Sequence, residues 1–267
     1  MEENQREGMS LKENIIGECK EVFAIVADTF THLKTREGII LMSTLVGVMI
    51  WGPKGTPIFS SLLTSWLNEI PAESLWREQL LSFITGSLVL VVAPILIIKL
   101  VLHERLVDFG LGLGNFKLGS ALTLVLIVFS VPLFQLGANS TSMQLEYPML
   151  YRGILGPARP EAFSWSSFVL YEATYALFFL TIEFIFRGYL LFGLSRRFGR
   201  YAVLFQMLSY TAWHLVKPLP ELSGTLFWGF ATAAVTLRTR SLWYVFVAHY
   251  ILNIYLDCMI LHGQGVF

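Results

Sequence analysis

The chain of 267 residues is strongly apolar, because 55% of its residues are hydrophobic and only 14% are charged. Soluble domains carry about a quarter charged residues, so this composition excludes an ordinary soluble enzyme, a secreted domain and a disordered chain. The 19 basic and 19 acidic residues balance, which also argues against a nucleic acid bound through its phosphates. The sequence is therefore that of a membrane protein.

The first predicted element is an amphipathic helix within an N-terminal arm, residues 1–36. Residues 12–34 repeat apolar side chains at helical intervals, a pattern typical of a helix that lies on the membrane surface. The apolar members are Ile15, Ile16, Val22, Phe23, Ile25, Val26 and Phe30.

Seven later segments are apolar enough to be transmembrane helices, which need roughly 20 residues to cross a bilayer core about 30 Å thick. They are residues 38–51, 80–98, 118–136, 163–194, 201–216, 223–237 and 241–256. We predict an all-α, polytopic membrane bundle of about seven transmembrane helices plus the N-terminal amphipathic helix. Its expected parts are the arm, N-terminal transmembrane helices (37–137), a linker containing prolines and glycines (138–161) and a C-terminal core (162–267).

Basic residues predict the orientation of these spans. Lys and Arg alternate between many and few along the successive connections, with thirteen on one side, five on the other and Arg187 inside a span. Because basic residues collect on the cytoplasmic side, we expect a multi-pass protein of the cell (inner) membrane with a cytoplasmic N-terminus and an outside C-terminus.

Polar side chains gather in the C-terminal spans, although an ionisable group costs at least about 2.5 kcal/mol in a bilayer core. The group comprises Glu172, Glu183, Arg187, Tyr210, His214, His249, Asn253 and Asp257. Several are four residues apart and so share one helix face. We therefore expect three helices to turn polar faces toward one hydrated cavity. The simpler explanations are an ion pair within one helix, a histidine at the membrane interface and interhelical hydrogen bonds, with Asp257 solvated at an interface.

These groups can carry out a definite chemistry. A carboxylate beside a neutral imidazole can hold a water and take its proton, while a second imidazole and a carboxamide donate to an oxyanion. Glu183 with His214 supplies the first pair and His249 with Asn253 the second. This set can hydrolyse an amide without a serine or cysteine nucleophile, with Arg187 positioning Glu183. A small transporter or metal site that uses Glu183, His214 and His249 is a less favoured interpretation.

The same residues resemble the motifs of the CPBP family, the CAAX-processing and bacteriocin-processing (Abi) intramembrane proteases. That family carries Glu-Glu-x3-Arg, Phe-x3-His and His-x3-Asn in this order. Residues 182–187, 210–214 and 249–253 read IEFIFR, YTAWH and HYILN, and the resemblance covers roughly residues 163–257.

The resemblance implies an all-helical bundle that hydrolyses peptide bonds without a covalent intermediate, a metal or another cofactor. In such proteases the first glutamate and the second-motif histidine, here His214, activate water. The third-motif histidine and asparagine, here His249 and Asn253, hold the oxyanion. Tyr210 replaces the usual phenylalanine and is assigned to substrate binding.

One motif residue departs from the family, because Ile182 stands where the first glutamate is expected. Neighbouring residues on a helix point about 100° apart, so Glu183 cannot occupy that place in a regular helix. Either Glu183 has taken over the role of base in a divergent endopeptidase, or the protein is a non-catalytic scaffold, partner-stabilising or immunity-type protein.

The expected partners follow from the peptidase hypothesis. They are a membrane protein or peptide cleaved near the membrane or at its C-terminus, and the lipid bilayer, with no nucleic acid. Prenylated CAAX tails are expected as substrates only where the host prenylates proteins.

Overall fold

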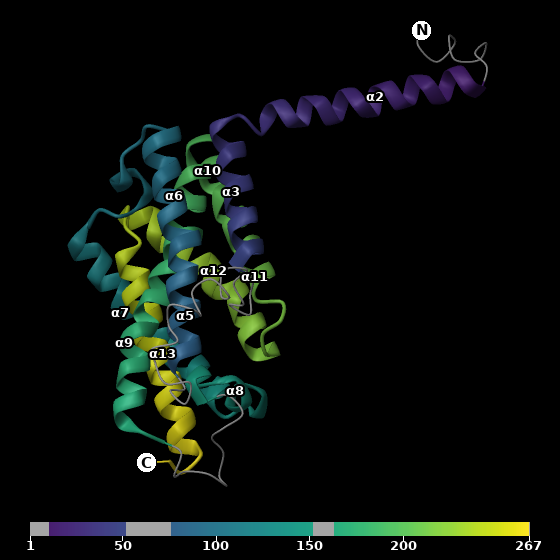
Figure 1. Cartoon of the computed structure of the whole chain (residues 1–267). Helices are drawn as coiled ribbons and strands as arrows, with labels where there is room; N and C mark the ends of the chain where they lie inside the picture. Colours follow the sequence, from purple (N-terminus) through teal and green to yellow (C-terminus); the bar gives the residue numbers. More distant parts are fainter. Residues whose placement is uncertain (1–10, 52–75, 152–162, 267) are drawn as a thin grey trace.

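The computed structural model describes residues 11–51, 76–151 and 163–266. Within these ranges the elements are helices and turns, without a strand. Figure 1 shows a bundle from which one long N-terminal helix, α2, projects. The main helices are α2 (Leu11–His32), α3 (Arg36–Trp51), α5 (Trp76–Ser87), α6 (Ala93–Leu96), α7 (Phe116–Ala138), α8 (Thr141–Glu146), α9 (Trp165–Glu183), α10 (Leu191–Phe198), α11 (Ala202–Trp213), α12 (Leu219–Thr239) and α13 (Trp243–Gly263).

Four helical stretches are long and apolar enough to cross a membrane, judged by length and composition. They are Gln79–Val101, Phe116–Ala138, Trp165–Trp213 and Trp243–Gly263. These stretches confirm the predicted helical membrane bundle. The stretch Trp165–Trp213 includes α11 and so covers two of the predicted spans. Helices α3 and α12 coincide with two further predicted spans, and the total of seven spans stays a prediction.

The helix that begins at α9 runs through the core of the bundle. It continues through a π-helical stretch, η7 (Phe184–Leu190), into α10, and every residue from 181 to 194 is buried. A helix that is buried on all sides must be surrounded by other elements rather than cover a surface. This central position places the motif of residues 182–187 inside the protein.

Helices α7 and α13 pack closely because Gly119 leaves room for an aromatic ring. A Cβ atom at Gly119 would lie 2.3 Å from the ring of Tyr244. The Tyr244 hydroxyl donates to the carbonyl of Leu113 (2.6 Å). The close contact fixes α7 beside the helix that carries the third motif.

The structure contains the predicted N-terminal helix, and it has short helical elements in the segment predicted to be a linker. Helix α2 forms where an amphipathic helix is expected, and its apolar side chains are exposed, as for Phe23 at 77%. The segment 138–161, expected to be a linker, contains α8 and a 3₁₀ turn (Met149–Tyr151). Residues 152–161 of that segment lie outside the described residues.

Candidate active site

A buried ionic cluster joins four helical segments, α9–η7, α11, α12 and α13, behind the site. The carboxylate of Glu183 accepts a hydrogen bond from His249 Nδ1 (2.7 Å), and its other oxygen lies 3.4 Å from Arg187 Nε. Arg187 also donates to the Thr232 hydroxyl (3.0 and 3.2 Å) and stacks 3.9 Å from the centre of the Tyr210 ring. Both charged side chains are fully buried, so each compensates the charge of the other away from water.

His214 ends α11 in a defined tautomer. Its Nδ1 lies 2.7 Å from the backbone oxygen of Tyr210. Because a carbonyl only accepts hydrogen bonds, Nδ1 must carry the hydrogen, and in the neutral ring Nε2 keeps a lone pair. That Nε2 lies 3.7 Å from an oxygen of Glu221.

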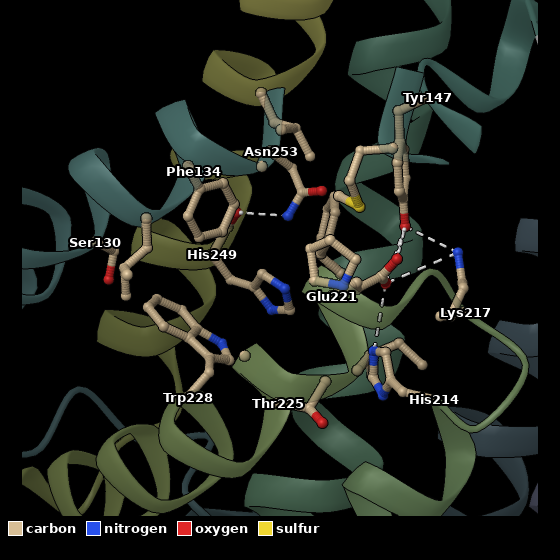
Figure 2. Close-up of a pocket in the computed structure, with 18 of the residues that line it drawn as sticks. Ser130, Phe134, Tyr147, His214, Lys217, Glu221, Thr225, Trp228, His249 and Asn253 are labelled. Carbon is tan, nitrogen blue, oxygen red and sulfur yellow. Dashed lines mark hydrogen bonds and ion pairs between the residues drawn. The ribbon is translucent and has the colours of Figure 1, made fainter. Parts of the chain in front are cut away.

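A cavity of about 150 Å³ lies among α7, α9, α11, α12 and α13. Of the predicted site residues, Tyr210, His214, His249 and Asn253 line this cavity. Figure 2 shows the two histidines and Asn253 around it. The remaining walls are largely apolar, and they include Leu133, Phe134, Phe178, Phe179, Phe227 and Leu256.

Two predicted site residues, Glu183 and Arg187, are not among the residues that line the cavity, whereas Ile182 is. This follows from the helix rotation between neighbours of about 100°. Glu183 therefore contacts His249 rather than His214, the partner expected from the sequence. Asn253 donates one amide hydrogen to the carbonyl of His249 in its own helix (3.2 Å).

Sequence reasoning missed a connected polar group at the cavity, formed by Tyr147, Lys217 and Glu221. The Tyr147 hydroxyl lies 2.9 Å from each Glu221 oxygen, and Lys217 Nζ donates to that hydroxyl (2.8 Å). Burial raises the pKa of Tyr147 well above its usual value, so the phenol remains a donor. Only a few residues connect the predicted spans 201–216 and 223–237. This short connection is the feature of the sequence that indicates that Glu221 lies near His214.

Two tryptophans place further donors at the cavity. Trp213 and Trp228 line it, and within the described part of the chain their buried indole N–H groups have no hydrogen-bond partner. Both are donors that a substrate carbonyl can use.

One expectation fails in this region, and the less favoured metal-site interpretation finds no support. Asp257 is fully buried instead of solvated at an interface, because α13 continues beyond it to Gly263. Among the described residues, no three His, Cys, Asp or Glu side chains are grouped to hold a metal ion. The set Glu183, His214 and His249, required for a metal site, is thus not assembled.

Comparison with known proteins points to one family. Residues 162–255 match the family model described as Rce1-like, type II CAAX prenyl endopeptidase Rce1-like. No curated protein and no solved structure matches the chain. The matched segment contains all three sequence motifs and, in the structure, α9, α11, α12 and the cavity-lining part of α13.

Proposed function

Because the chain belongs to the CPBP family through its Rce1-like residues 162–255, we propose that it is an intramembrane endopeptidase. Its substrate is a membrane-proximal or C-terminal segment of a membrane protein or peptide. The observation that carries this proposal is the cavity, which is lined by the imidazole of His214 at the end of α11 and by the imidazole of His249 and the carboxamide of Asn253 on α13, inside a largely apolar bundle.

The oxyanion side of the proposed site is His249 with Asn253. His249 Nδ1 donates to Glu183, which fixes the ring and leaves Nε2 for a group in the cavity. The proposed contact with an oxyanion uses the imidazolium form of His249, in which Nε2 also carries a hydrogen. Asn253 uses one amide hydrogen within its helix and has a second to donate. Glu183 is then a positioning residue that acts through His249, and Arg187 compensates its charge.

The water side of the proposed site is His214, whose Nε2 accepts a hydrogen bond from water. Tyr210 lines the same cavity and contacts the substrate in this scheme. The apolar walls from α7 and α12 suit the side chains of a peptide that leaves the bilayer. The distribution of Lys and Arg supports an inner-membrane protein with a cytoplasmic N-terminus.

The test is cleavage of quenched fluorescent peptides by the full chain in lipid nanodiscs. The probes are a transmembrane-anchored peptide and a C-terminal peptide with and without a farnesyl group. His214→Ala and His249→Ala are each expected to lower kcat/KM at least about 100-fold, because water activation and oxyanion stabilisation are lost. In labelled water, ¹⁸O enters the new carboxyl group.

The control is His262→Ala, near the end of α13 and outside the cavity lining, which keeps wild-type activity. Full activity in both cavity variants would remove this mechanism.

A second candidate is a non-catalytic membrane scaffold or immunity-type protein, and Ile182 favours it. This aliphatic side chain lines the cavity where the motif has its first glutamate. The scaffold function predicts that the wild type cleaves no probe, whereas Ile182→Glu gains activity.

A further inference from the structure

The cavity does contain a carboxylate, but a different helix supplies it. Position 182 is an isoleucine, and Glu183 does not line the cavity. Among the described residues that line it, Glu221 of α12 is the single acidic residue. Glu221 is therefore the candidate to act in place of the glutamate that is absent at position 182.

The turn between α11 and α12 brings Glu221 to His214. Hydrogen bonds from Lys217 N to the His214 carbonyl (2.9 Å) and from Leu222 N to the Pro218 carbonyl (2.9 Å) close this turn. Prolines at 218 and 220 fix their φ angles there. Glu221 lies in the first turn of α12, where the helix dipole favours a negative charge.

A phenol and an ammonium group hold the Glu221 carboxylate from the side away from His214. Figure 2 shows Glu221 between Tyr147 and His214, with Lys217 beside it. Tyr147 donates at 2.9 Å, and Lys217 Nζ lies 3.8 Å from Oε1. The side chain of Lys217 is only 8% exposed, so its charge is weakly screened.

Two hydrogen-bond acceptors, one on His214 and one on Glu221, therefore lie close together at the cavity. With Nδ1 of neutral His214 donating to Tyr210, both His214 Nε2 and Glu221 Oε1 are acceptors, and they lie 3.7 Å apart. Such a pair is satisfied by one molecule that donates to both. A water about 2.8 Å from each atom does so with its two hydrogens.

We propose that Glu221 is the catalytic base of this chain, replacing the glutamate absent at position 182; this rests on the proposed peptidase function. The water oxygen forms a bond to the scissile carbonyl carbon, and its proton passes to Glu221. The carbonyl oxygen becomes an oxyanion held by His249 and Asn253. When the C–N bond breaks, Glu221 returns the proton to the leaving amine, and the second proton of the water stays on the new carboxyl group, giving a carboxylic acid and an amine.

The deciding experiment compares Glu221→Gln with wild type on the peptide probes described above. Loss of the base is expected to lower kcat at least about 100-fold, with KM changed less than about threefold. The reason is that general-base catalysis accelerates a reaction about 10²–10⁴-fold. The matched control is Glu146→Gln. Glu146 is also paired with Lys217 (3.1 Å) but is not a cavity-lining residue, and its variant keeps activity within about threefold of wild type.

A double variant distinguishes a catalytic role of Glu221 from a structural role. Ile182→Glu restores a carboxylate on another wall of the same cavity, so Ile182→Glu with Glu221→Gln is expected to regain at least about a tenth of wild-type kcat. Each variant is checked for an unchanged melting temperature in detergent.

The outcomes distinguish the two proposals. An active wild type with equally active Glu221→Gln overturns Glu221 as base and leaves the peptidase function standing. The proposal for Glu221 is also overturned if Glu221→Gln loses activity, is not rescued by Ile182→Glu and has a lower melting temperature than wild type. The residue is then structural. An inactive wild type with active Ile182→Glu overturns both, in favour of a non-catalytic protein.

Discussion

Ile182 and Glu183 are neighbours in the chain, but their side chains meet different surroundings. Ile182 lines the cavity, whereas Glu183 is fully buried between Arg187 and His249. A carboxylate in a low-dielectric interior requires a compensating charge, and Arg187 supplies it from the next turn of the same helix. The pair thus accounts for why both charges are tolerated inside the bundle.

Removing one member of this pair is expected to destabilise the protein. Arg187→Met leaves a buried charge uncompensated and lowers the free energy of unfolding by about 3–5 kcal/mol. The double variant Glu183→Gln with Arg187→Met recovers part of this loss, because neither charge remains. Denaturation midpoints in mixed micelles measure the effect. Arg238→Met, at an exposed site of α12, is the control; additive losses in the double variant would contradict the coupling.

At the scale of elements, helix ends and irregular turns determine where the residues of the candidate active site lie. Helix α11 stops at Trp213, which leaves His214 at the start of the turn that carries Glu221 back. The π-helical stretch η7 holds Arg187, and such stretches occur frequently at functional sites. Hydrophobic periodicity predicts where these helices lie, but it does not predict a π turn or an early helix end.

The exposed face of α2 is expected to bind a lipid surface. Ile16, Phe23 and Phe30 are exposed by 46–77%, and they share one helix face. In a peptide of residues 11–34, Phe23→Glu is expected to weaken partitioning into phosphatidylcholine vesicles at least about tenfold, because an apolar side chain is replaced by a charge. Sedimentation with vesicles and the gain of helical circular dichroism measure this partitioning. The control, Glu21→Gln, changes the opposite face, and equal binding by the Phe23 variant would refute a membrane role.

At the scale of the whole molecule, one carboxylate ties together distant parts of the chain. Glu104, just after the stretch Gln79–Val101, accepts two hydrogen bonds from Arg36 of α3 (2.7 and 2.9 Å) and one from Arg196 of α10 (2.7 Å). Arg36 also donates to the carbonyl of Gly193. These contacts connect three helical segments at one end of the bundle.

This tie makes stability depend on pH in the acid range. The hydrogen bond from Arg36, with the nearby charges, lowers the pKa of Glu104 below its ordinary 4.5 despite partial burial. The stabilisation is therefore fully present above the unfolded-state pKa and is lost as the pH falls through the folded one. Glu104→Gln is expected to lower Tm by a few degrees at pH 7, and by progressively less below pH 4.5. Melting curves across pH test this, with the exposed Asp28→Asn as control; a constant difference at every pH would contradict it.

The sequence by itself determined the membrane-embedded helical bundle, because few charges and long apolar segments leave the chain no other stable environment. Spacing of four residues also selected the polar faces that carry His214, His249 and Asn253. Tertiary structure decided the rest: that Glu183 contacts His249, that Asp257 is buried, and that Tyr147, Lys217 and Glu221 reach the cavity. The reason is geometric. Spacing along a helix fixes which residues share its face, but the rotation of neighbouring helices and the path of a short turn depend on packing between segments far apart in the chain.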